Sequence, residues 1–500
     1  MRDLVLTLFI FGMLPVCFSQ PRIGLLMWTW VSYMSPHRLT WGFAYDFRFV
    51  YIIAIVTILG VIFSKDETIA RRPPINAITI LSVMFMIWIT ITTLNAYNPT
   101  GANWEWQRFM KIQVMILATY MLITDQKWLH RIIWVVVISI CFWGWKGAIF
   151  SVLTGGFHRV YGPPGSFFHD NNGLALALVM TVPLIRYLFT QTKNRLGKIS
   201  LIILAIMCIL AILGTYSRGG FLGLAVLAVF FWLKTPRRLT LLVSFAVIAF
   251  STNHFMPDRW KARMDLLQSD QQTVSTAIIA SNSILDTSSL GRLNAWKFAV
   301  NLANDHIPFG GGFQTFQYFL FLKYAPAPWM LHDSHSIYFE VIGEQGWGGF
   351  FIFISLHLLA FRSGSWVLRR TKRRPDLKWA SEMATSIQIG LVGYWASGIF
   401  LGLAYFDLPY HFISILVILK SFVSHKLSQE APRHSTVISP MIKTETSIFS
   451  GQTIPSRTQK PYDTKSKLMR PKTWPVSSSK IEPSARKKPS QEDFKSIFPR

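Results

Sequence analysis

The feature of this sequence that most constrains its fold is a series of apolar stretches, each about fifteen to twenty-five residues long, which recurs from the N-terminus to residue 424. A helix of about 20 residues crosses a hydrocarbon core of about 30 Å, and a helix satisfies its own backbone hydrogen bonds there. The sequence therefore predicts an all-α, polytopic integral membrane protein with about 12 transmembrane helices.

The predicted helices follow the apolar stretches. They lie near residues 4–19, 43–63, 74–93, 105–124, 131–153, 171–190, 199–214, 219–233, 238–252, 336–361, 384–405 and 408–424. Segment 23–34, which contains Trp28 and Trp30, is too short to cross a bilayer, so we expect it to lie in the membrane interface or to dip into the membrane and return.

Basic residues predict the orientation, because they mark cytoplasmic loops. If the N-terminus is cytoplasmic, the basic clusters at 65–72, 186–198, 234–238 and 369–374 all fall inside. Segment 253–334 then becomes a large periplasmic loop between the ninth and tenth helices, and its six basic residues are balanced by six acidic ones. The net charge of +26 therefore reflects topology and the C-terminal region, and it indicates no nucleic-acid partner.

The sequence divides into two regions. Residues 1–427 form a predicted transmembrane domain that includes loop 253–334. Aromatic side chains are available to build a small core in this loop: Trp296, Phe313, Phe316 and Tyr318. From residue 428 the composition changes to Ser, Pro, Thr and Lys without apolar periodicity, which predicts that residues 428–500 are a disordered basic cytoplasmic tail.

Two histidines, His332 and His335, lie near the predicted start of the tenth helix, where ionisable side chains usually have a function or a partner. A helix N-terminus disfavours protonated imidazole, so His335 would stay neutral and able to accept a proton. The alternative is an interfacial histidine that bonds a loop carbonyl. Helical spacing turns Glu340 and Glu344 away from His335, which favours a structural role for both glutamates.

Two arginines are candidate phosphate ligands. Arg218 lies in a polar, glycine-containing break at 214–220, and a guanidinium fork between helices matches phosphate oxygens. An arginine that snorkels to lipid headgroups would fit the same position. Arg292 begins the amphipathic run 292–297, where a solvated surface arginine is the alternative.

The predicted outside loop 157–173 combines aromatic and hydrogen-bonding side chains around a Pro-Pro-Gly turn. This composition is typical of sugar binding and makes Arg159 and Asn171 candidate substrate ligands. The loop would serve equally well as a rigid connector that caps the following helix.

The sequence contains no phosphate-binding loop, dinucleotide fingerprint or zinc-ligand spacing. Its cysteines, Cys17, Cys141 and Cys208, lie within apolar stretches and suggest no disulfide framework. We therefore expect no cofactor and no metal site, and an activated substrate that carries its own leaving group.

Several of these motifs together resemble the O-antigen ligase and polymerase superfamily over residues 40–425. They are Ser217-Arg218-Gly219-Gly220, Gly291-Arg292-Leu293 with Trp296, Pro308 with 310–313, and His335-x-x-Tyr338-Phe339 with Glu344-x-Gly346. Segments 36–42 and 165–173 are similar to the O-glycosylation ligases associated with exosortase A systems. Ser336 stands where many relatives carry Asn.

The resemblance implies a glycosyltransferase of the bacterial inner membrane with its active site facing the periplasm. Such an enzyme transfers a glycan from undecaprenyl pyrophosphate to a hydroxyl of a protein, lipid or glycan acceptor, without metal. The resemblance also implies that His335 is the general base and that Arg218 and Arg292 are the pyrophosphate ligands. A lipid-linked glycan polymerase or a polysaccharide flippase are the alternatives, although the large loop and the lack of repeats disfavour a transporter.

Overall fold

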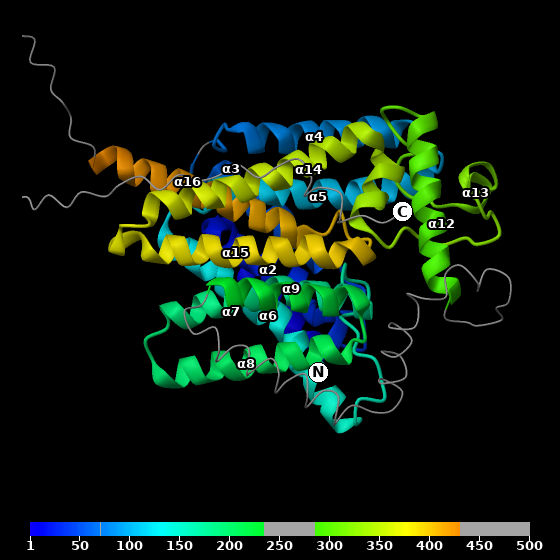
Figure 1. Ribbon diagram of the computed structural model, residues 1–500. Coiled ribbons are helices and arrows are strands. Elements are labelled where there is room, and N and C mark those ends of the chain that lie inside the picture. Colours follow the sequence, from blue (N-terminus) through cyan, green and yellow to red (C-terminus); the bar gives the residue numbers. More distant parts are fainter. Residues whose placement is uncertain (71, 235–285, 431–500) are drawn as a thin grey trace, which may run out of the picture. The chain divides into compact units, whose positions relative to one another are not determined.

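The computed structural model describes residues 1–70, 72–234 and 286–430 (Figure 1). Every regular element in these ranges is a helix, which confirms the predicted all-α class. The predicted ninth helix, 238–252, and the first part of the predicted periplasmic loop lie outside the described residues, as does nearly all of the predicted tail.

The elements follow one another along the chain. They are α1 (Arg2–Ser19), α2 (Pro21–Met34), η1 (Pro36–Leu39), α3 (Phe49–Phe63), α4 (Ala77–Leu94), α5 (Pro99–Leu122), α6 (Gln126–Leu153), α7 (Asn171–Gln191), α8 (Arg195–Gly214), α9 (Arg218–Lys234), α12 (Asp286–Asp305), α13 (Tyr318–Tyr324), α14 (Ile337–Thr371), η2 (Pro375–Leu377), α15 (Lys378–Ser397), η3 (Gly398–Phe400) and α16 (Asp407–Glu430).

Seven of the described helices are long and apolar enough to cross a membrane: α1, α4, α6, α7, α8, α14 and α16. Helices α3 and α9 are equally apolar in character but shorter. The described part of the chain is thus a multi-pass α-helical membrane protein, and the predicted number of about 12 spans stays a prediction.

The N-terminal region differs from the prediction. Helix α2 does not lie in the interface, because most of its side chains are buried and it packs against α3 and α6. It returns the chain to the end of the bundle where α1 begins, and the Asp3 carboxylate there accepts hydrogen bonds from the N–H groups of Gly42 (2.9 Å) and Ala44 (3.1 Å).

This reversal places the N-terminus at the same end of the bundle as His335. Arg38, in the loop after α2, lies against Gly165, and the neighbouring Ser166 lines a cavity together with His335. The sequence predicted opposite sides for Met1 and His335. That prediction was wrong because α2 was not counted as a crossing.

Helix α12 lies across this end of the bundle and packs against α14 (Figure 1). Together with α13 it encloses a small core: Ala295, Phe298, Leu302, Leu320, Phe321 and Tyr324. Of the four aromatics predicted to build this core, only Phe316 packs against it. Phe313 belongs to the main core, Trp296 stacks on Phe339, and Tyr318 is 57% exposed.

Helix α14 is interrupted at Gly346, whose φ of 65° is left-handed. A Cβ at Gly346 would lie 2.2 Å from the Pro308 carbonyl oxygen, so only glycine lets the two backbones approach. Loop backbone groups bond to the interrupted helix: Gly311 N–H to Gly343 O (2.9 Å), Gly312 N–H to Glu344 O (2.8 Å) and Gly348 N–H to Pro308 O (3.1 Å). The glycine motifs at 310–312 and 346 therefore meet in space.

Candidate functional site

His335 lies in the loop just before α14, with a left-handed φ of 40°. Its side chain is half-buried, and its ring is 4.9 Å from the ring of His332, centroid to centroid, in an edge-on arrangement. The two histidines that the sequence singled out are therefore neighbours. A non-glycine residue held in this backbone region is uncommon, and such residues cluster at functional sites.

Helix α12 holds this loop in place. The Trp296 indole N–H donates to the Ser334 carbonyl at 2.8 Å, and its ring stacks on Phe339 with centroids 4.7 Å apart. Gly291 lies directly against His332, since a Cβ there would be 2.9 Å from the imidazole Cδ2. The motif residues of α12 thus position the histidine loop from one side.

Charged groups surround His335. Burial is the main effect and lowers the pKa of His335, the positive charges of His332 and Arg292 lower it further, and Asp333 and Asp170 oppose them. The net effect keeps the pKa of this imidazole below its ordinary value of about 6.5. His335 is therefore neutral at pH 7 and can accept a proton.

Arg292 and Arg218 lie close to each other. Burial, and then the charge of Arg218, lower the pKa of the Arg292 guanidinium. Both side chains are half-buried, and the Arg292 Nε is a buried nitrogen without a hydrogen-bond partner among the described residues. Two guanidiniums held together at low exposure favour an anion between them, and phosphate oxygens match their geometry.

A cavity of about 590 Å³ extends from the histidines. Its ionisable lining residues are Glu105, Arg108, His169, Asp170, His332, Asp333, His335, Glu340 and Glu344. The described residues contain no cluster of three or more His, Cys, Asp or Glu side chains arranged to hold a metal ion.

The two glutamates of α14 face the same cavity as His335, contrary to the prediction from helical spacing. That argument failed because His335 precedes the helix and does not share its phase. The expected structural role is nevertheless seen: Glu340 accepts a hydrogen bond from the Ala404 N–H (2.9 Å), and Glu344 accepts one from the Gln314 N–H (2.8 Å).

The two candidate residues from loop 157–173, Asn171 and Arg159, do not line the cavity that contains the histidines. Asn171 donates from Nδ2 to the Thr215 carbonyl at 2.8 Å, which ties α7 to the turn that precedes Arg218. Arg159 is exposed and does not line the cavity. The structure thus makes Asn171 a positioning residue for the Arg218 turn and does not bring Arg159 to the site.

Several residues of the cavity were not predicted from the sequence, and two of them matter most here. Asp170 caps α7 by accepting from the Gly173 N–H, and its charge acts on His335. Arg108 extends from α5, and its guanidinium carbon lies 3.5 Å from the centroid of the Phe167 ring. The available signal for Arg108 was an ionisable side chain inside a predicted spanning helix.

The fold and the site define a class: a multi-pass α-helical membrane protein with a polar cavity at one end of its helical bundle. Comparison with known families is more specific. Residues 202–354 match the family model described as O-Antigen ligase, and this segment contains Arg218, Arg292 and His335. The match supports the O-antigen ligase superfamily, and with it a membrane ligase or polymerase role, as the resemblance implied.

The rest of the chain is less informative. Residues 1–193 match a family of unknown function, DUF5935. No curated protein matches the chain. The relation to exosortase-associated ligases stays a prediction.

Proposed function

We propose that this protein is a glycosyltransferase that moves a glycan from a polyprenyl-pyrophosphate donor, undecaprenyl pyrophosphate in bacteria, to an acceptor hydroxyl. One observation carries the proposal. A neutral, half-buried His335 lies within reach of the charge of Arg292, which is itself within reach of the charge of Arg218, and all three belong to the segment that matches the O-antigen ligase model.

The chemistry divides between these residues. The His335 imidazole takes the proton of the acceptor hydroxyl as the acceptor oxygen bonds to the anomeric carbon. The bond between that carbon and the pyrophosphate oxygen breaks, and the lipid pyrophosphate leaves with the bonding electrons. Arg218 and Arg292 stabilise its developing negative charge, a role that requires no metal ion or cofactor.

His332 and Asn171 have supporting roles in this proposal. His332 lines the cavity, and its Nδ1 lies 2.7 Å from the Asp333 carbonyl oxygen, which fixes its ring beside His335. Asn171 holds the turn before Arg218. Arg159 is exposed on its loop and has no role in this proposal.

Product analysis tests the proposal. Purified protein in lipid nanodiscs is mixed with lipid-linked glycan and candidate acceptors, without nucleotide and with EDTA, and products are identified by mass spectrometry. A glycosylated acceptor plus free lipid pyrophosphate supports a ligase. Lengthened lipid-linked glycan identifies a polymerase, and movement of intact donor across a vesicle membrane without either product identifies a flippase.

The pH dependence of transfer is a prediction of the site electrostatics. Since the pKa of His335 is lowered, the acidic limb of the rate profile should lie below about pH 6.5, with full activity above it. Asp333 raises that pKa, so Asp333→Asn should move the limb to still lower pH, and Arg292→Gln should move it to higher pH. Rate–pH profiles with saturating donor measure the shifts; shifts of opposite sign would contradict the assignment.

Membrane orientation is a second prediction. We propose that the cavity faces the periplasm, so cysteines at the exposed positions Arg2 and Pro326 should react with an impermeant thiol reagent in intact spheroplasts. Lys372→Cys, at the opposite end, should react only after lysis. The native cysteines are buried and give little background. Labelling of Lys372→Cys alone would invert the orientation.

A further inference from the structure

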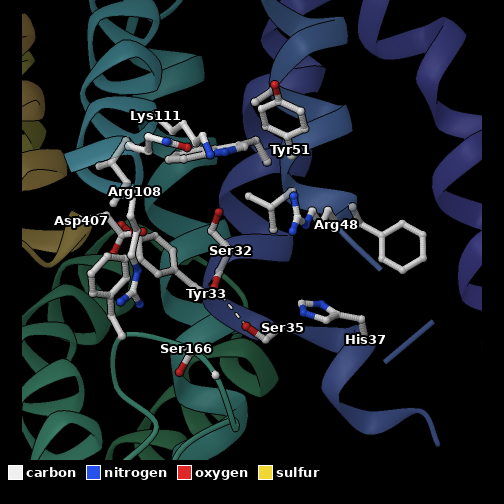
Figure 2. A pocket seen from close by; sticks show the side chains of 18 of the residues that line it. Ser32, Tyr33, Ser35, His37, Arg48, Tyr51, Arg108, Lys111, Ser166 and Asp407 are labelled. Atoms are coloured by element: carbon white, nitrogen blue, oxygen red, sulfur yellow. Dashed lines mark hydrogen bonds between the residues drawn. The ribbon is translucent and has the colours of Figure 1, made fainter. Parts of the chain in front are cut away.

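A second, larger cavity, of about 970 Å³, lies between α3, α5 and the end of α2. We call it the α3–α5 pocket. Figure 2 shows side chains from these elements converging on it, with Arg48 and Tyr51 on one wall and Arg108 and Lys111 on another. Apart from Arg108, none of these residues lines the cavity of His335, so the pocket needs an explanation of its own.

The lining has two kinds of surface. Beside the loop after α2 it is cationic, with four basic side chains (Arg38, Arg48, Arg108 and Lys111) and two carboxylates (Asp46 and Asp407). Along the two helices it is apolar, with Ala54, Ile55, Ile58, Met110 and Val114. A pocket with one charged end and one apolar wall fits an amphiphile whose headgroup is anionic.

The positive charge is only partly neutralised by the protein. Arg38 pairs with Asp46 at 2.8 Å, and Arg108 lies 3.9 Å from Glu105. Arg48 has no ion pair or hydrogen bond from its side chain within the described part of the chain, and Lys111 has only a cation–π contact with Tyr51, 5.3 Å from the ring centroid. Two cations are thus left for a ligand.

The apolar wall opens toward the membrane. Ile55 and Val114 line the pocket yet are 40% and 41% exposed, so their surfaces face the hydrocarbon of the bilayer in a membrane-spanning bundle. An acyl chain can therefore follow this wall while its headgroup reaches Arg48 and Lys111. A water-soluble anion would leave the apolar wall uncovered.

We propose that the α3–α5 pocket binds one anionic bilayer phospholipid, with its phosphate between Arg48 and Lys111 and an acyl chain along α3 and α5. The bound lipid lies next to the catalytic cavity, because Arg108, Ser166, Phe167 and Phe406 line both spaces. The site is independent of the proposed transfer reaction, and its proposed phosphate ligands, Arg48 and Lys111, belong to the segment that matches a family of unknown function.

Lipid retention tests the site. Purified protein is equilibrated with equal amounts of phosphatidylglycerol and phosphatidylcholine in detergent, and bound lipid is counted by native mass spectrometry. The unmodified chain should retain one phosphatidylglycerol in preference. Arg48→Gln and Lys111→Gln should each lower this preference roughly fivefold, since one basic residue near a lipid surface contributes about 1 kcal/mol. The double variant should lower it about twenty-five-fold.

Matched controls exist on the same chain. Lys198 makes a comparable cation–π contact with Phe189 (5.5 Å), and Arg195 is an exposed arginine at a helix start; neither lines the pocket, so Lys198→Gln and Arg195→Gln should keep the preference. Ala54→Phe should fill the apolar wall and reduce retention. Leu59→Phe, on the same helix outside the pocket, should not.

Three results would overturn the proposal. One is equal retention of the two phospholipids by the unmodified chain. Another is unchanged preference in the Arg48→Gln, Lys111→Gln double variant. The third is displacement of phosphatidylglycerol by an equimolar polyprenyl phosphate, which would assign the pocket to a substrate lipid. All three readouts are independent of glycan transfer.

Discussion

Replacement of His335 by alanine should reduce glycan transfer by about 10² to 10⁴ while the protein stays folded and inserted, because the change removes the proposed general base. His335 lies in a loop and is half-buried, so its loss opens no core cavity. Initial rates with purified protein and saturating donor measure the effect. The variant should also lose the acidic limb of the pH profile, which a purely structural change would leave in place.

Two histidine variants serve as controls. His425→Ala changes an exposed histidine at the far end of α16 and should transfer normally. His332→Ala should have a milder effect than His335→Ala, since His332 acts by placing its neighbour. Normal transfer by a well-expressed His335→Ala protein would refute the base assignment.

Lysine in place of Arg218 or Arg292 should weaken use of the donor by roughly tenfold to a hundredfold, the cost of a lost charge-assisted hydrogen bond of about 1.5–3 kcal/mol. Lysine keeps the charge but lacks the planar fork that binds two phosphate oxygens. Binding of a soluble lipid-pyrophosphate analogue should fall in both variants. The double variant should lose less binding free energy than the sum of the two single variants if both arginines bind the same phosphate group.

A control arginine lies at the opposite end of the bundle. Arg195 is exposed, and Arg195→Lys should bind the analogue normally. Higher acceptor concentration should not rescue Arg218→Lys or Arg292→Lys, because their defect lies in the donor. Normal analogue binding combined with low protein yield would instead assign both arginines a structural role.

The sequence predicted those site residues that are ionisable and lie beside apolar, membrane-spanning segments. Arg218 and His335 stood out because ionisable groups beside spanning helices are costly. In the structure the charge of Arg292 acts on His335, and the charge of Arg218 acts on Arg292. The all-helical class followed from the same property. These inferences needed no knowledge of how the helices pack.

Other features depend on packing and could not be predicted. Whether α2 crosses the bundle is decided by its partners α3 and α6, because its 14 residues are too few to reveal a crossing by length alone. The direction of His335 relative to Glu340 and Glu344 is set by the loop before α14, because helical spacing applies only from Ile337 onward. Arg108 and Asp170 join the cavity only through tertiary contacts.

The break in α14 at Gly346 has a mechanical consequence. Main-chain hydrogen bonds fasten α14 to the loop after α12 on both sides of the break, through the Gly343 and Glu344 carbonyls before it and the Gly348 N–H after it. The histidine loop is fastened to α12 as well, through Trp296. The His335 loop is thus held by α12 on one side and leads directly into α14, which is itself fastened to the loop after α12. Any shift of α12 would therefore move the proposed base and the start of α14 together relative to Arg218, which begins a different helix of the bundle.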